Sequence, residues 1–267
     1  MSADLEAQRG AAWWVYALIG LGAGYLSGLF GVGGGTVIVP ALVAFAVFDR
    51  KLASGTSLLA IVPTSLVGAI TYGIDGNVHV LTAAILAVGT VIGAQIGTWL
   101  LSRLSNQTLR WAFIAFLVVV AVQLAFTVPV RDAEVEMTVG LVLGLIAVGL
   151  ATGVLSGLLG VGGGVIVVPA MILLFGYSDL LARGTSLLMM LPTAVSGTIG
   201  NLRRRNVDLR AGAIIGVSAC VTVALGTLTA GAIAPQVANL LFVAFLVFLI
   251  LKTLQEALKN RRRPAGA

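Results

Sequence analysis

Two glycine-rich segments are the parts of this sequence best suited to bind a ligand without a charged side chain. They read Gly31-Val-Gly-Gly-Gly-Thr36 and Gly160-Val-Gly-Gly-Gly-Val165, and each immediately precedes a short apolar run. Glycine leaves its amide N–H uncovered and adopts φ values closed to other residues. A helix start also leaves its first N–H groups unpaired and carries about half a positive charge. The pattern predicts two oxyanion cradles, although neither segment matches a P-loop or GxGxxG.

Hydroxyl side chains follow each glycine segment at the same distance. Gly55-Thr56-Ser57 and Gly184-Thr185-Ser186 stand at the start of the next apolar runs. These hydroxyls are either N-caps of the helices that begin there or additional donors to the same anion site. The candidate binding residues are Gly33, Gly34, Gly35, Thr36, Thr56, Ser57, Gly162, Gly163, Gly164, Val165, Thr185 and Ser186.

A proline interrupts the middle of each of these runs, at Pro63 and Pro192. Proline removes a helical hydrogen bond and bends the axis. Each proline is therefore either a hinge for a conformational change or a packing kink.

The composition indicates that membrane helices position these groups. Of 267 residues only 10% are charged, against about 25% in a soluble domain, while 59% are hydrophobic and the mean hydropathy is +1.08. Such a chain cannot cover itself with a water-soluble surface. This excludes a soluble enzyme and a nucleic-acid binder, despite a pI of about 10.1. The single cysteine excludes an internal disulfide and a CxxC site.

Ten apolar runs fit a polytopic, all-α membrane protein, because a backbone in lipid must satisfy its own hydrogen bonds. Two of them, 36–48 and 165–177, contain only 13 residues and would rise about 20 Å as helices, too little to cross. Each is therefore expected to begin or end within the membrane. The predicted segments span 12–30, 36–48, 55–74, 79–102, 107–128, 138–159, 165–177, 184–202, 209–234 and 236–256.

The second half of the chain repeats the first at a constant offset of 129 residues. Residues 24–42 align with 153–171 without a gap, and 13 of these 19 positions are identical. The duplication predicts four regions. They are a first transmembrane repeat at 11–128, an extracytoplasmic linker at 129–137, a second repeat at 138–256 and a basic cytoplasmic tail at 257–267.

The arginines predict that the two repeats are inverted. The loop at 103–110 carries Arg103 and Arg110, whereas the basic loop of the second repeat, at 203–210, lies one helix earlier in its repeat. Under the positive-inside rule, corresponding loops then lie on opposite sides of the membrane. This requires an odd number of crossings per repeat, either five or three plus a re-entrant hairpin formed by the first two segments. An alternative of four plus four spans would give parallel repeats.

Other glycines and the few acidic residues have simpler interpretations. Glycines spaced by four, such as Gly20, Gly24 and Gly28, indicate close helix packing. Asp179 and the single histidine, His79, fall at predicted ends or loops, so the sequence offers no acidic proton relay, metal site or cofactor site. An anion would instead meet backbone N–H groups, hydroxyls, or a terminal arginine such as Arg183.

The duplicated boxes GLFGVGGGxxxVPAL and GLLGVGGGxxVVPAM, each followed by AxGTSL and Pro-Thr, resemble the sulfite exporter TauE/SafE family, also called the 4-toluene sulfonate uptake permease family. The resemblance covers about residues 15–256. It implies a bacterial inner-membrane secondary transporter, not an enzyme, for sulfite, sulfoacetate or related organosulfonates. Members usually have seven to nine spans and a four-helix repeat, whereas the arginines here favour an odd number.

The expectation from sequence is therefore an inverted-repeat carrier that moves a small sulfur-containing anion by alternating access. Its expected partners are this anion and the lipid bilayer, with no cofactor and no nucleic acid, and with homo-oligomer formation left open. Proton coupling through the substrate itself and simple facilitated flux both remain open. The alternatives are a channel-like facilitator of another small anion and a membrane-embedded assembly partner without transport.

Overall fold

The computed structural model describes residues 12–101, 106–126, 137–159 and 162–261. Within these ranges the chain forms ten helices and no strand, which confirms the all-α prediction. Among the described residues, five helices are long and apolar enough to cross a membrane. Their spans are Trp13–Phe30, Lys51–Ile74, Val139–Ser156, Leu209–Ala232 and Pro235–Gln255. These lengths and compositions confirm a polytopic membrane protein.

The helices fall into two sets of five that correspond through the repeat. The first set is α2 (Trp13–Phe30), α3 (Gly35–Phe45), α4 (Arg50–Ile74), α5 (Val80–Leu101) and α6 (Asn106–Phe126). The second set is α7 (Val139–Leu159), α8 (Gly164–Phe175), α9 (Asp179–Arg203), α10 (Leu209–Ala232) and α11 (Pro235–Arg261).

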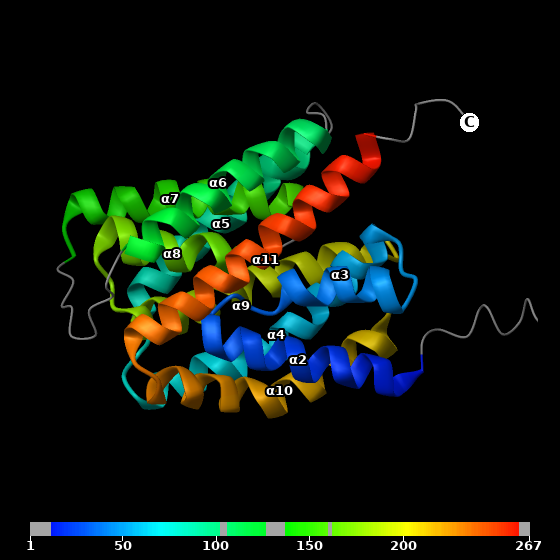
Figure 1. Ribbon diagram of the computed structural model, residues 1–267, viewed down its shortest axis with the longest axis horizontal. Helices are drawn as coiled ribbons and strands as arrows, with labels where there is room; N and C mark the ends of the chain where they lie inside the picture. The colour runs from blue at the N-terminus through cyan, green and yellow to red at the C-terminus, as the bar shows by residue number, and fades with distance from the viewer. Residues whose placement is uncertain (1–11, 102–105, 127–136, 160–161, 262–267) are drawn as a thin grey trace, which may run out of the picture.

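Six of the long helices pack in a row, in the order α7, α5, α9, α4, α10 and α2 (Figure 1). The order is symmetric about its centre, where α4 lies against its repeat equivalent α9. The first helix of each repeat packs on the fourth helix of the other, and α11 crosses the row on one face (Figure 1). The two repeats therefore interlock, and neither has a core of its own.

Contacts between α4 and α9 show that the repeats are inverted. A Cβ on Gly68 would lie 2.7 Å from Leu187, and a Cβ on Gly197 would lie 2.8 Å from Leu58. Residue numbers therefore rise along α4 while they fall along α9, so the two helices run antiparallel. Because α9 is the repeat equivalent of α4, this confirms the inversion predicted from the arginines.

The glycines spaced by four pack the interlocked helices, as predicted. A Cβ on Gly20, Gly24 or Gly28 of α2 would collide with a backbone carbonyl of α10. Gly149 and Gly153 of α7 approach α5 in the same way. Side chains of any size would push these helices apart, since close helix approach in a membrane depends on small residues.

The first two helices of each repeat form a hairpin. In the first repeat, the rings of Tyr16 and Phe48 lie 6.2 Å apart, while a Cβ on Gly34 would lie 3.3 Å from the carbonyl of Ala23, so α2 and α3 run antiparallel. With 11 residues α3 rises only about 16 Å. It therefore begins inside the bundle, and its length supports the re-entrant interpretation of the short runs.

The structure corrects one predicted boundary in each repeat. Helices α4 and α9 begin at Arg50 and Asp179, five residues before the predicted starts. The N-caps are Asp49, whose carboxylate accepts from the amides of Lys51 (2.8 Å) and Leu52 (2.9 Å), and Ser178, whose hydroxyl accepts from the amide of Leu181 (3.2 Å).

The interpretation of the Gly-Thr-Ser hydroxyls as N-caps is therefore wrong, because these residues lie one turn inside their helices. Each apolar run begins later than its helix because charged residues occupy the helix start, Arg50 and Lys51 in α4 and Asp179 and Arg183 in α9.

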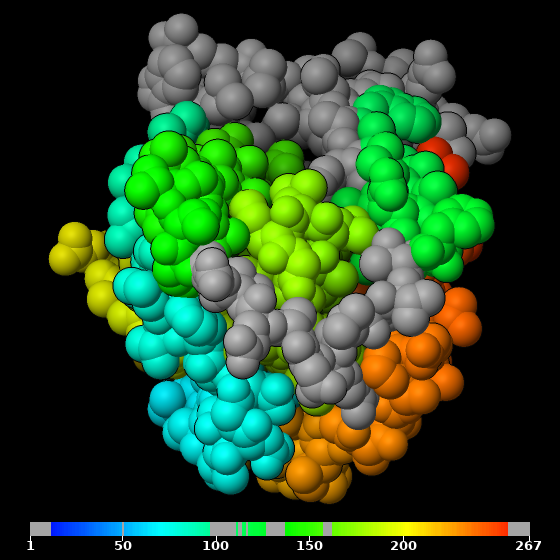
Figure 2. Space-filling model, turned by 90° about the vertical axis from the view of Figure 1, so that its left-hand side faces the viewer, coloured from blue at the N-terminus to red at the C-terminus, as the bar shows by residue number. Residues whose placement is uncertain are grey.

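Figure 2 views the molecule from the end at which α9 begins. The connection between α8 and α9 lies at the centre of this face, bordered by α7, the α4–α5 turn and the α10–α11 turn. The start of α9 is thus surrounded by other elements, and its charged residues Asp179 and Arg183 are buried.

Candidate functional site

The tips of the two hairpins meet inside the bundle. Gly31, Gly33 and Gly34 have φ values of +69°, +73° and +73°, and Gly162 and Gly163 both have +83°. These values are in the left-handed region that favours glycine. A Cβ on Gly164 would lie 2.7 Å from the carbonyl oxygen of Gly31 and 2.7 Å from Cα of Val32. Two segments that are 129 residues apart in sequence are therefore in direct contact.

Two helix N-termini meet at this contact, one from each repeat. Gly34 caps α3 and its carbonyl accepts from the amides of Val37 and Ile38, both at 2.9 Å. Gly163 caps α8 in the same way. The N–H groups of the preceding residues have no intrahelical acceptor. The methyl end of Met190 lies close to both Gly33 and Gly162, so the positive ends of two helix dipoles are near each other, which favours an anion.

Four buried hydroxyls lie on the hairpins and on α4 without a hydrogen-bond partner among the described residues. They are Ser27, Thr36, Ser57 and Thr152, with exposed fractions between 0 and 4%. The methyl group of Thr152 would be 2.9 Å from a Cβ on Gly163, so this side chain is next to the second tip. Buried polar atoms without partners are rare in proteins. A bound ligand or water would satisfy them.

The other predicted hydroxyls already have protein partners. Thr56 accepts from the amide of Asp208, and Thr185 accepts from the amide of His79, both at 3.0 Å. These two bonds hold the start of the opposite repeat's fourth helix. Ser186 donates to the carbonyl of Gly31 at 2.9 Å and is therefore in contact with the first tip.

Two apolar side chains cover the tips, and sequence analysis did not identify them. A Cβ on Gly33 would overlap the methyl end of Met190, and one on Gly162 would lie 3.0 Å from the same methyl and 3.5 Å from Ile61. Met190 and Ile61 occupy equivalent positions in the two repeats, at the offset of 129. Residues 31–36 and 162–169 are all buried. These side chains therefore separate the tips from solvent in this structure.

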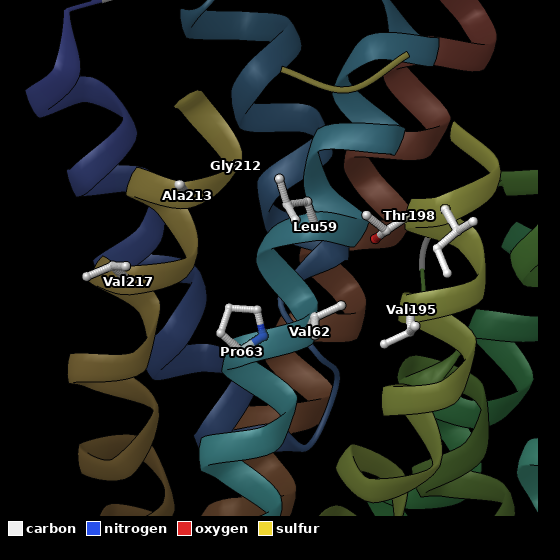
Figure 3. A pocket seen from close by; sticks show the side chains of 9 residues that line it. Leu59, Val62, Pro63, Val195, Thr198, Gly212, Ala213 and Val217 are labelled. Atoms are coloured by element: carbon white, nitrogen blue, oxygen red, sulfur yellow. The ribbon is translucent and has the colours of Figure 1, made fainter. Parts of the chain in front are cut away.

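A cavity of about 310 Å³ lies between α4, α9 and α10. Figure 3 shows Pro63 and Val62 on one side, Val195 and Thr198 on another, and Val217 on the third. The lining is almost wholly apolar, so this cavity has few groups that bind an anion. It does place free space directly beside Pro63, one of the two predicted hinges.

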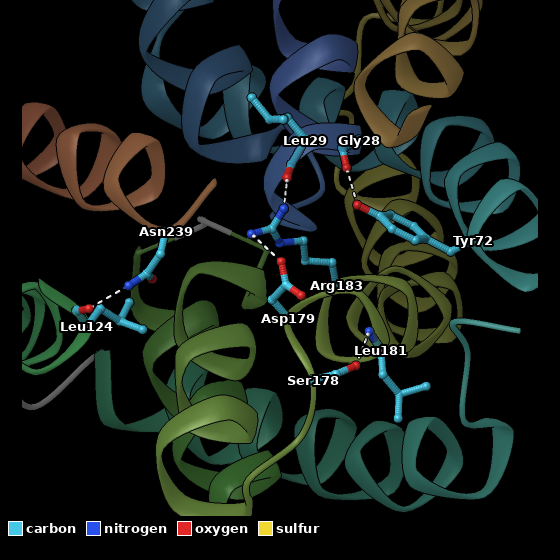
Figure 4. A network of polar contacts seen from close by, with 9 residues as sticks. All are labelled: Gly28, Leu29, Tyr72, Leu124, Ser178, Asp179, Leu181, Arg183 and Asn239. Carbon is cyan, nitrogen blue, oxygen red and sulfur yellow. Dashed lines mark hydrogen bonds and ion pairs between the residues drawn. The ribbon is translucent and has the colours of Figure 1, made fainter. Parts of the chain in front are cut away.

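A buried ion pair adjoins the first tip (Figure 4). Nη1 of Arg183 donates to the carbonyl of Leu29 at 2.8 Å, and Nη2 lies 3.4 Å from a carboxylate oxygen of Asp179. Tyr72 donates to the carbonyl of Gly28 at 2.7 Å. Arg183 and Asp179 are only 1% and 0% exposed.

Asp179 lies at the end of a helix, as predicted from the sequence, but it is buried. It is the first residue of α9, but this helix begins inside the protein. The i, i+4 spacing of Asp179 and Arg183 is a sequence signal that could have revealed the pair.

The pair is not repeated in the other half of the molecule. At the offset of 129, Arg183 corresponds to Ser54, Asp179 to Arg50 and Tyr72 to Asn201. The glycine tips are thus nearly identical in sequence, whereas their polar surroundings differ.

Comparison with known proteins identifies related chains. The sequence profile of the family described as "Sulfite exporter TauE/SafE" matches residues 16–180 and again 145–267, as expected for a duplication. The "Probable membrane transporter protein YunE" of Bacillus subtilis is 28% identical over 211 residues, covering 70% of this chain and 77% of that protein. "Sulfite exporter TauE/SafE family protein 1" of Arabidopsis thaliana is 31% identical over 103 residues, 39% of this chain and 23% of the relative.

Proposed function

Since the chain belongs to the sulfite exporter TauE/SafE family, we propose that it is a secondary transporter that carries a small sulfur-containing anion across the cytoplasmic membrane. Sulfite, sulfoacetate and related organosulfonates share a compact oxyanion group that accepts several hydrogen bonds. The anion is held between the hairpin tips, where backbone amides and hydroxyls donate to its oxygens.

One observation carries this proposal: two helix N-termini of opposite direction meet at glycine-rich tips inside the bundle. The contact of Gly164 with Gly31 places both dipole ends together, and unpaired hydroxyls at Thr36 and Thr152 lie on the same two hairpins. Transporters with inverted repeats hold anions at such helix ends near the bilayer midplane. The proposed contacts are with the residues named from the sequence except Thr56 and Thr185, whose hydroxyls hold helix starts. We add Ser27 and Thr152.

The mechanism that fits this symmetry is alternating access. Met190 and Ile61 cover the tips from equivalent positions, so displacing one side chain or the other would open the site to one side of the membrane. Pro63 and Pro192 lie inside α4 and α9. Each proline follows the covering side chain of its own helix by two residues. Bending at either proline would move the cover on the same helix.

The distribution of basic residues supports an orientation with the C-terminus in the cytoplasm. Arg203, Arg204, Arg205 and Arg210 are all exposed, and the end of α11 lies at the same end of the bundle as the α9–α10 turn (Figure 1). Positive charge on one side marks the cytoplasmic face. The linker predicted at 129–137 lies, apart from residue 137, outside the described residues, and its extracytoplasmic location stays a prediction.

Sulfite flux into proteoliposomes tests the proposal. Gly34→Ala and Gly163→Ala each place a methyl group in a tip, 3.3 Å from the Ala23 carbonyl and 2.9 Å from Thr152, and we expect each to lower flux by about tenfold or more. Gly76→Ala and Gly176→Ala are matched controls, since both have positive φ values but open space around them. Their flux should stay near that of the wild type.

Equal loss in controls and tip variants would remove the tips from the site. A channel-like facilitator is distinguished in the same vesicles, because its unitary conductance would far exceed carrier turnover.

A further inference from the structure

We propose that Arg183 is the cationic ligand of the transported anion and that Asp179 is its exchangeable counter-ion. Each monovalent anion that binds Arg183 is then accompanied by one proton on Asp179. This inference rests on the proposed function, because it names the charged ligand and the coupling ion of the same carrier.

Arg183 contacts the first hairpin through its backbone and through its side chain. A Cβ on Gly31 would lie 2.6 Å from Cα of Arg183, so the backbone of α9 is in contact with the tip. Its Nη1 donates to the carbonyl of Leu29, two residues before Gly31. A movement of this hairpin would therefore move the guanidinium, which connects anion binding to the conformational change.

The guanidinium has hydrogen-bonding capacity that its protein neighbours leave unused. Arginine has five N–H donors. Here Nη1 donates to Leu29, the Asp179 carboxylate lies at 3.4 Å from Nη2, and Nε has no hydrogen-bond partner among the described residues although the side chain is 1% exposed. A buried cation with an unmet Nε–H donor next to an oxyanion cradle is suited to bind an oxyanion once Asp179 is displaced from Nη2.

Charge balance then determines what Asp179 must do. In the empty carrier Arg183 and Asp179 together are neutral. A bound monovalent anion would leave one net negative charge among buried side chains, which is unfavourable. Uptake of one proton by the Asp179 carboxylate restores neutrality. The carboxylate that held Arg183 is then a neutral acid, and the anion replaces it as the partner of the guanidinium.

The surroundings contain few competing ionisable groups. On its own helix Asp179 faces Arg183, and from α4 it is coupled to Tyr72, which is engaged with the Gly28 carbonyl. Helix α8 has no ionisable side chain and neither does α5. His79, just before α5, has its ring nitrogen bonded to Thr82 at 2.9 Å. Among the described residues, Asp179 is the carboxylate that lies against Arg183, and the proposal therefore assigns the proton to it.

Replacement of the carboxylate tests this coupling. In Asp179→Asn the empty site has one positive charge and the loaded site is neutral. Exchange of labelled for unlabelled sulfite across the vesicle should persist within about threefold of wild type, because only the loaded form crosses. Net uptake driven by an acid exterior should fall by about tenfold or more and become dependent on membrane potential, because the empty form now returns as a cation.

Two further variants of this chain serve as controls. Asp179→Glu keeps a titratable carboxyl and should restore proton-driven uptake, and Ser54→Ala changes the equivalent of Arg183 in the other repeat and should have no effect. Wild-type uptake should respond by less than about twofold to a potassium diffusion potential set with valinomycin.

The possible outcomes distinguish a failure of this inference from a failure of the proposed function. If wild-type vesicles carry sulfite but Asp179→Asn keeps full proton-driven net uptake, the inference is overturned and the proposed function stands; the proton would then travel on the substrate. Strongly potential-driven uptake by the wild type also overturns it, even if the Asn variant does not fold. If the wild type carries no sulfite, the proposed function itself fails.

Discussion

The α2–α3 hairpin and the α7–α8 hairpin have the same glycine pattern but lie next to different side chains. At the first tip, Arg183 and Tyr72 bind the last carbonyls of α2, and Asp179 pairs with the arginine. The equivalents on the other side are Ser54 and Asn201, and the Asn201 amide donates to Gly197 of its own helix. Duplication made the backbone of the site symmetric, while its charge comes from one repeat alone.

This difference shows which parts of the molecule are constrained by folding and which by chemistry. Positions that both repeats keep, such as Gly24 with Gly153 and Thr56 with Thr185, pack helices or hold helix starts across the repeat boundary. Arg183, Asp179 and Tyr72, which the other repeat does not keep, lie beside the first tip. An inverted-repeat carrier needs two equivalent gates, but one charged ligand is sufficient for one anion.

Removal of Arg183 is expected to have the largest effect on the difference between the two repeats. Arg183→Ala leaves Asp179 buried without its cation, and we expect a loss of about 3–5 kcal/mol in the free energy of unfolding together with loss of sulfite flux. Ser54→Ala, at the equivalent position, should change the free energy of unfolding by less than about 1 kcal/mol. Thermal unfolding in detergent and flux measure both. Equal effects of the two variants would contradict the asymmetry.

A smaller effect distinguishes the contacts that the two tips make with Met190. Gly33→Ala would place its methyl group against Met190, and Gly162→Ala would place it 3.0 Å from the same side chain. We expect both to reduce flux, with a larger reduction of about tenfold for Gly33→Ala because the overlap is greater. Adding Met190→Ala should recover part of the flux in Gly33→Ala.

In a double-mutant cycle, the coupling energy between positions 33 and 190 measures how far the methionine controls access. Additive effects of the two substitutions would show that Met190 does not cover the tip.

Much of the architecture followed from the sequence because membrane burial and duplication leave strong periodic signals. The apolar runs predicted the helices, the offset of 129 predicted two equivalent sets of five, and the position of Arg103 relative to Arg203 predicted the inversion. Glycines at intervals of four correctly predicted the packing surfaces.

What the sequence could not show depends on tertiary contacts. Hydropathy placed the starts of α4 and α9 too late, because it counts a charged residue such as Arg50 or Arg183 as lying outside the membrane span. It does so even where the charge is buried and paired, as that of Arg183 is. It did not reveal that Asp179 is buried, since burial of a helix start depends on the elements around it. Ile61 and Met190 were indistinguishable from other apolar helix residues until the tips were seen beneath them.

The central claim is that both tips form one anion site. Isothermal titration of the purified protein with sulfite in detergent tests it most directly. The account predicts one anion per chain, with binding lost in Gly34→Ala and equally in Gly163→Ala, and retained in Gly76→Ala and Gly176→Ala. Two anions per chain, or a single tip variant that binds as the wild type does, would contradict it.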